Sequence, residues 1–171
     1  MFPATRPLAP QSDTRTLWCG LSRGGPSMDD DTLRHRLYDL YAAFAEGRID
    51  NALLSFDEEV TMTSYAPVDV FPYLGRKQGK AAIAATMRSA HSEFEYLGYT
   101  PVFMVTENET AAAIVLARLR QRATSRIIQL FVADFFRLKN GRIVELREFM
   151  DSFDAVQQVL GREIELAKAP Q

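Results

Sequence analysis

The chain has 171 residues, of which 47% are hydrophobic, and a formal net charge of −2. This length and apolar content predict a single domain with a well-formed core. The small net charge and the lack of a basic arm argue against nucleic acid as a partner. Without an apolar run of about 18 residues, no membrane span is expected.

Cysteine and histidine usage excludes two further kinds of site. The single cysteine, Cys19, cannot form an internal disulfide and indicates a reducing compartment, so we expect a cytoplasmic protein. The two histidines, His35 and His91, lie far apart without ligand spacing, so we expect neither a metal nor a cofactor.

Residues 1–27 are predicted to lie outside the folded domain. They hold four of the eight prolines, show no apolar period, and lack the hydrophobic core of a signal peptide. We expect a disordered extension, or a segment upstream of a natural start at Met28. The domain is then expected over residues 28–162, with a short tail at 163–171.

Two helices and a strand are predicted to begin the domain. Acidic residues 29–31 complement the N-terminal dipole of a helix that Gly47 ends. Its apolar stripe is Leu33, Leu37, Leu40, Tyr41 and Phe44. A short helix at about 50–54 follows, and residues 59–65 then alternate as a strand. Tyr41 is either a core or rim residue or a hydroxyl that reaches a pocket.

A loop and a second long helix come next. Residues 66–75 contain two prolines and three large apolar residues, which predicts an ordered loop that packs on the domain. Phe71, Tyr73 and Leu74 either floor or gate a pocket, or simply cover the core. Residues 79–94 have helical spacing of apolar side chains.

Three further strands are predicted at about 99–106, 110–121 and 126–138. In the middle one, Arg118, Arg120 and Arg122 alternate with apolar residues, which indicates a solvated outer face. A final short helix follows Asp151 or Ser152, either of which can cap it.

The stretch 132–151 reads as two strands joined at Asn140 and Gly141, the strongest short-range signal for a hairpin. A two-residue loop would pair Lys139 with Arg142. A three-residue loop, with Gly141 in a bulge, would pair Leu138 with Arg142. Since side chains alternate at period two, the choice decides which residues share a face.

We favour the three-residue loop, because it separates an apolar face from a charged one. Its inner face would be Val132, Asp134, Phe136, Leu138, Val144, Leu146, Glu148 and Met150. Burying an ionised carboxylate costs several kcal/mol unless it is paired. One interpretation is that Asp134 pairs with a nearby arginine, or that the loop is of the two-residue type and places Asp134 near Arg147. The other is that Asp134 borders a ligand cavity in which both acids have a raised pKa.

Helices first, a helix inserted after the first strand, and then an antiparallel meander predict an α+β fold. The segment Asp134-Phe135-Phe136-Arg137-Leu138 resembles Asp-His-Phe-Arg-Phe of ketosteroid isomerases. Residues 141–148, Gly-Arg-Ile-Val-Glu-Leu-Arg-Glu, resemble Gly-Lys-Ile-Val-Glu-His-Trp-Asp of SnoaL-like polyketide cyclases. Over about residues 30–161 the chain thus resembles the NTF2-like superfamily. This resemblance implies an NTF2-like (cystatin-like) cone, a curved sheet wrapped around its helices with an internal pocket.

The resemblance also implies roles for the two acids. Asp134 would match the protonated acid of the isomerase oxyanion hole, and Glu148 the acid/base of the cyclases, a position where limonene epoxide hydrolases also carry an acid. The isomerase base falls on the first strand, where this chain offers only Thr63 or Ser64. The isomerase tyrosine falls at Leu40, next to Tyr41.

We therefore expect an isomerase, cyclase or hydratase that acts on a small hydrophobic carbonyl compound, with Glu148 and Asp134 as catalytic residues. The substrate pocket is predicted to include Tyr65, Tyr41, Met62, Phe71 and Tyr73. A non-catalytic domain that binds a small ligand and a structural or assembly domain are the alternatives. Exposed aromatic residues on the outer face of the sheet, Phe131, Phe135 and Phe149, predict a homodimer.

Overall fold

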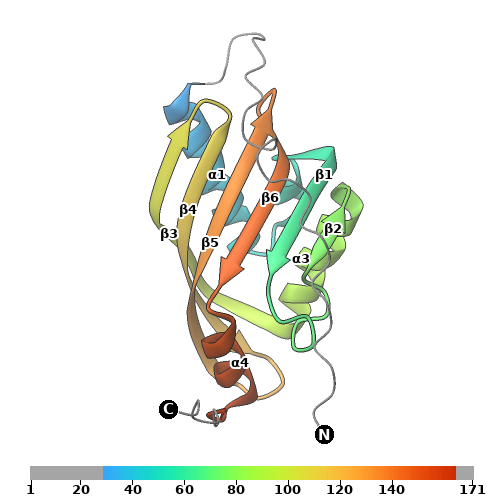
Figure 1. Cartoon of the computed structure of the whole chain (residues 1–171), viewed down its shortest axis with the longest axis vertical. Helices are drawn as coiled ribbons and strands as arrows, with labels where there is room; N and C mark the ends of the chain where they lie inside the picture. Colours follow the sequence, from blue (N-terminus) through green and yellow to red (C-terminus); the bar gives the residue numbers. More distant parts are fainter. Residues whose placement is uncertain (1–28, 165–171) are drawn as a thin grey trace, which may run out of the picture.

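A curved six-stranded sheet, with helices packed on one face, forms the frame of the molecule (Figure 1). The computed structural model describes residues 29–164, so the predictions for residues 1–27 and for the tail beyond 164 lie outside the described residues. The elements are α1 (Asp30–Ala45), α2 (Ile49–Leu53), β1 (Phe56–Tyr65), β2 (Arg76–Gln78), α3 (Lys80–Glu93), β3 (Phe94–Glu107), β4 (Thr110–Gln121), β5 (Ile127–Lys139), β6 (Arg142–Met150) and α4 (Ser152–Leu160). The predicted α+β class is confirmed.

The strand order is β2-β1-β6-β5-β4-β3. All neighbouring strands run antiparallel except β1 and β6, which run parallel to each other. The sheet does not close on itself, since β2 and β3 are its two edges. Figure 1 shows α1 and α3 behind the sheet, while α4 lies at one end of β5 and β6. One face of the sheet is therefore the inner face, turned toward the helices, and the other is the outer face.

Helix ends follow the signals in the sequence. The Asp29 carboxylate accepts a hydrogen bond from the Thr32 backbone N–H at 2.9 Å and caps α1. Asp151 caps α4 in the same way, through the N–H groups of Phe153 and Asp154. Gly161, with φ of 66°, ends α4 in the left-handed conformation that glycine adopts without strain.

The core lies between α1, α3 and the inner face of the sheet. Burial alternates along β4 and β5, as expected for a sheet that is covered on one side. Leu33 and Leu37 of the predicted helix stripe are fully buried. Arg118, Arg120 and Arg122 are exposed, so the predicted outer face of β4 is confirmed.

Strand boundaries differ from the prediction at two places. β1 begins at Phe56 and β3 at Phe94, each several residues earlier than alternation indicated. The C-cap of α3, Phe94, is already in extended conformation, so β3 follows the helix without a connecting loop. β2, which spans only three residues, was not predicted because it is too short for a period.

The β5–β6 turn corrects the favoured interpretation. Lys139 pairs with Arg142 across a two-residue turn, and both turn residues have positive φ, 52° at Asn140 and 73° at Gly141. This is the two-residue Asn-Gly loop and not the predicted three-residue one. The two-residue form is preferred because its twist matches that of the flanking strands.

A bulge in β6 restores the predicted inner face. Leu138 pairs with Ile143 but Arg137 pairs with Glu145, so Val144 is an extra residue. Ile143 consequently lies in the core, against the prediction. Beyond the bulge, Leu146 stands opposite Phe136, as the inner-face assignment required.

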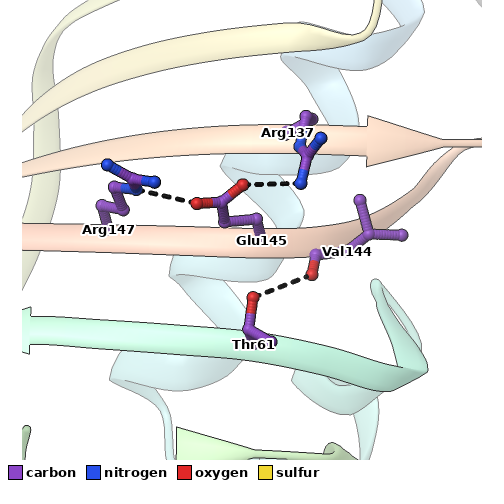
Figure 2. A network of polar contacts seen from close by, with 5 residues as sticks. All are labelled: Thr61, Arg137, Val144, Glu145 and Arg147. Atoms are coloured by element: carbon purple, nitrogen blue, oxygen red, sulfur yellow. Dashed lines mark hydrogen bonds and ion pairs between the residues drawn. The ribbon is translucent and has the colours of Figure 1, made fainter. Parts of the chain in front are cut away.

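Polar contacts on the outer face lie around this bulge (Figure 2). The Thr61 hydroxyl of β1 donates to the Val144 carbonyl oxygen at 3.4 Å. Beside it, Glu145 lies between Arg137 and Arg147, with N–O distances of 2.7 Å to each.

None of the helices within residues 29–164 combines the length and the apolar character that a membrane span requires.

Candidate functional site

Two carboxyl groups face each other on the inner face of the sheet. Asp134 of β5 and Glu148 of β6 are directly opposite in the antiparallel register. Asp134 is only 3% exposed, while Glu148 is half-buried. Without the bulge at Val144, the two-residue turn would place Arg147 opposite Asp134 and turn Glu148 outward. The bulge is therefore what makes the acid pair.

Tyr41 of α1 contacts the more buried acid. Its hydroxyl donates to Asp134 Oδ2 at 2.8 Å. Its ring packs against those of Tyr99 and Phe136, with centroids 5.9 Å and 6.2 Å away. The other carboxyl oxygen, Oδ1 of Asp134, is buried and has no hydrogen-bond partner among the described residues. Tyr41 thus fixes one oxygen of Asp134 and leaves the other open to a further group.

Ser64 of β1 plays the equivalent part for Glu148. The two residues are paired in the parallel β1–β6 register, and Ser64 is 4% exposed. The Ser64 hydroxyl donates to Glu148 Oε1 at 2.6 Å. This bond holds one oxygen of the carboxyl group, and Glu148 is a lining residue of the cavity described below.

Burial controls the protonation of this pair. Removal from water raises the pKa of Asp134 well above its ordinary value, and the nearby Glu148 charge raises it further, against the hydrogen bond from Tyr41. Burial also raises the pKa of Glu148, against the hydrogen bond from Ser64. The pKa of Tyr41 is raised by burial and by Asp134, so its hydroxyl keeps its proton. Asp134 is the more buried acid and is therefore the better candidate to hold a proton at neutral pH.

The acid pair borders a cavity of about 130 Å³. Its wall comes from α1, β1, the 66–75 loop, α3 and the inner faces of β3 to β6. Most lining side chains are aliphatic or aromatic, and Asp134 and Glu148 supply the only carboxyl groups of the lining within residues 29–164. No lysine, arginine or histidine lines this cavity in the described residues. Buried carboxyl groups in an apolar wall without a counter-ion are suited to proton transfer.

Four of the five predicted pocket residues line this cavity together with both acids: Tyr41, Met62, Phe71 and Tyr73. Tyr65 does not, and its assignment is corrected. It is 48% exposed and stacks on Phe149 on the outer face, with ring centroids 4.3 Å apart. The reason is strand alternation, since Ser64 and Met62 point inward from β1 and Tyr65 must point outward.

Sequence reasoning missed other lining residues. Tyr96 and Tyr99 line the cavity from β3. Tyr96 lies before the predicted start of this strand, and Tyr99 lies at that start but was not assigned to the pocket. Burial raises the pKa of Tyr99 well above its ordinary value, so it stays neutral. Ser64 was named only as a residue at the position of the isomerase base, where it cannot act as a base. Its contact with Glu148 was missed because it depends on the pairing of β1 with β6, strands far apart in the chain.

Comparison with known proteins supports the same architecture. Residues 37–146 match the SnoaL-like domain family. A candidate isomerase from Rhodopseudomonas palustris is 30% identical, with a TM-score of 0.71 over 79% of this chain and 100% of that chain. An NTF2-like protein from Burkholderia xenovorans is 20% identical, with a TM-score of 0.66 over 77% and 98% of the two chains. A candidate polyketide cyclase from Pseudomonas putida is 20% identical, with a TM-score of 0.64 over 74% and 96%. No curated protein matches the chain significantly.

Proposed function

The chain belongs to the SnoaL-like domain family and has its NTF2-like fold, and on this premise we propose that it acts on a small hydrophobic carbonyl compound by acid/base proton transfer. The reaction would be of the isomerase, cyclase or hydratase type. One observation carries the proposal: Asp134 and Glu148 face each other at an apolar cavity that no cationic side chain of the described residues lines. A fold does not determine a reaction, so the proposal depends on the chemistry of these two carboxyl groups.

Glu148 is the proposed acid/base. Its Oε1 is held by Ser64, so Oε2 is the oxygen that meets the substrate. As a carboxylate, it would take a proton from the carbon next to the carbonyl group, and the C–H electron pair would move to form an enolate. Returning this proton to another carbon completes an isomerisation. A raised pKa brings the carboxyl group closer to the operating pH, where proton transfer in both directions is efficient.

Asp134 is the proposed donor to the enolate oxygen. Tyr41 occupies Oδ2, so a proton on Oδ1 has no competing partner among the described residues. A neutral acid in an apolar site donates a strong hydrogen bond to a developing oxyanion. The residues that line the cavity from β1, Phe56 and Met62, include no carboxylate, so a single acid, Glu148, must both remove and return the proton.

The same lack of a base on β1 favours one second candidate, a non-catalytic domain that binds a small ligand. Such a domain would use the same cavity, and the two acids would only donate hydrogen bonds to the ligand. Proton exchange on a bound ketone separates the two functions, because a binding domain has no reason to accelerate it.

A homodimer through the outer face of the sheet belongs to the same proposal. Phe131, Phe135 and Phe149 lie there and are 58%, 43% and 40% exposed. An aromatic patch of this kind usually marks a contact surface. A sedimentation experiment at high micromolar concentration should show a dimer, and Phe131→Glu should yield the monomer. A wild-type monomer under these conditions contradicts this part. The single cysteine supports a cytoplasmic setting.

The test of catalysis uses deuterium exchange. Small ketones in D₂O should lose their α-proton NMR signals faster with the protein than in buffer. Glu148→Gln should slow this exchange by about a hundredfold or more, the usual contribution of an acid/base group. The matched control is Glu145→Gln, on the same strand but on the outer face, and it should retain the wild-type rate. A ketone that binds without any accelerated exchange would identify the binding domain instead.

A further inference from the structure

The described ionisable side chains of the cavity wall are all acids. Its ionisable groups are Asp134, Glu148 and tyrosines, and none of the described lining residues is cationic. Two arginines of the same hairpin, Arg137 and Arg147, lie on the outer face with Glu145 between them (Figure 2). An anionic ligand in the cavity would therefore lose its water and find no counter-ion, which is costly.

The basic residues near the cavity do not supply a counter-ion for an anionic ligand. His91 packs against the Tyr96 ring with centroids 4.5 Å apart, and its Nε2 lies 2.7 Å from the Phe44 carbonyl oxygen. Burial lowers the pKa of His91, so it carries no stable positive charge. Arg122 bonds the backbone carbonyl of His91 at 3.0 Å, outside the cavity.

The size of the cavity sets a second limit. A volume of about 130 Å³ is close to that of an apolar protein cavity that binds a single benzene molecule, about 150 Å³. Aromatic side chains surround this space, among them Tyr41, Phe44 and Tyr99. A ligand built on one planar ring with a short substituent matches this volume.

The polar groups set a third limit. Asp134 Oδ1 is buried and unpartnered among the described residues, and Glu148 lies directly opposite. A proton on Oδ1 would need an acceptor oxygen from a ligand. A carboxylate ligand could accept this proton, but it would bring a second negative charge next to the ionised Glu148, which their mutual repulsion in an apolar wall opposes.

We propose that the cavity selects an uncharged ketone built on a single ring, and that it rejects carboxylates of the same shape. This inference rests on the proposed function and names its substrate class. The selection depends on the charge and the size of the cavity, so a ligand can be selected even if no reaction takes place.

Two planar probes of equal heavy-atom count test the charge selection: acetophenone and benzoate. We expect titrations of the wild-type protein at pH 7, followed by ligand-observed NMR, to give acetophenone a dissociation constant roughly a hundredfold lower than benzoate. Benzoate binding as tightly as acetophenone would overturn the proposal. A steroid enone that binds more tightly than acetophenone would overturn the single-ring limit.

A substitution on β6 tests the cause. Met150 lines the cavity, so Met150→Arg supplies the missing cation, and benzoate should gain at least about tenfold relative to acetophenone. Phe149→Arg places the same charge on the outer face and should leave the ratio unchanged. A folded Met150→Arg protein that still rejects benzoate contradicts the argument from the missing counter-ion. If Met150→Arg does not fold, the wild-type comparison alone decides.

The outcomes separate this inference from the proposed function. Acetophenone that binds selectively but exchanges no α-protons leaves the ligand class intact and rejects catalysis. Preferred binding of an ion rejects the ligand class, while accelerated exchange on any other ketone would still support proton transfer by Glu148.

Discussion

The two faces of the β5–β6 hairpin hold carboxyl groups in opposite surroundings. On the outer face, Glu145 is bonded by Arg137 and Arg147. On the inner face, Asp134 and Glu148 face each other and, among residues 29–164, receive hydrogen bonds only from hydroxyl groups. Acids on one hairpin thus serve two purposes, because an acid with cationic partners stabilises a fold, whereas an unpaired buried acid exchanges protons.

The bulge at Val144 produces this difference. It shifts β6 by one residue against β5, so Glu148 and not Arg147 stands opposite Asp134. Bulges are frequent beside active sites because they redirect side chains in this way. The following predictions test whether the two faces differ as described.

The largest effect is expected from two adjacent phenylalanines of β5. Phe136 is 4% exposed and packs against Tyr41, whereas Phe135 is 43% exposed on the outer face. Phe136→Ala should lower the free energy of unfolding by about 3–5 kcal/mol, because it leaves a cavity in the core. Phe135→Ala should cost about 1 kcal/mol or less. Urea denaturation of both variants at low protein concentration measures the difference, and equal losses would show that the faces are wrongly assigned.

The second effect concerns Asp134 and depends on pH. Its folded pKa is raised above 3.8, so the folded state binds the proton more tightly than the unfolded chain. The stability that this group contributes is fully present below pH 3.8 and is lost as the pH rises through the raised folded pKa. Asp134→Asn should therefore stabilise the protein by about 1–3 kcal/mol at pH 8 and bring no gain in acid.

Thermal melts of wild type and Asp134→Asn across this pH range check the sign. A variant that is less stable than wild type at pH 8, with the deficit shrinking in acid, would show that Asp134 is ionised in the folded protein and is stabilised there as a carboxylate. Glu148 would then be the only catalytic candidate left at the site.

Much of the fold could be predicted from local signals. The caps at Asp29 and Asp151, the apolar stripe of α1 and the Asn140-Gly141 turn position all depend on neighbouring residues, and all are present. The inner position of both acids was also predicted, but through the wrong turn. The turn and the bulge compensate each other, and the sequence shows only their net effect on alternation.

The hydroxyl partners of the acids could not be predicted in the same way. Ser64 meets Glu148 through the parallel β1–β6 pairing, and Tyr41 meets Asp134 across 93 positions of the chain. Neither contact has a local signal, because both depend on how helix α1 and strand β1 pack in three dimensions. The pocket assignment of Tyr65 was wrong although the alternation of side chains along β1 already predicts the outer face for this residue.

The smallest effect is expected on the outer face. Glu145→Gln removes the carboxylate between Arg137 and Arg147, whose charges then repel each other. Partly exposed ion pairs contribute little, so the free energy of unfolding at neutral pH should fall by about 0.5–1 kcal/mol. The loss should shrink in 1 M salt, where the Debye length is only about 3 Å and exposed charges farther apart than this are largely screened. The sign is opposite to that of Asp134→Asn at pH 8, although both substitutions replace a carboxyl group by an amide. Denaturation curves at low and high salt measure this, and a gain in stability for Glu145→Gln would show that its arginine partners do not stabilise the outer face.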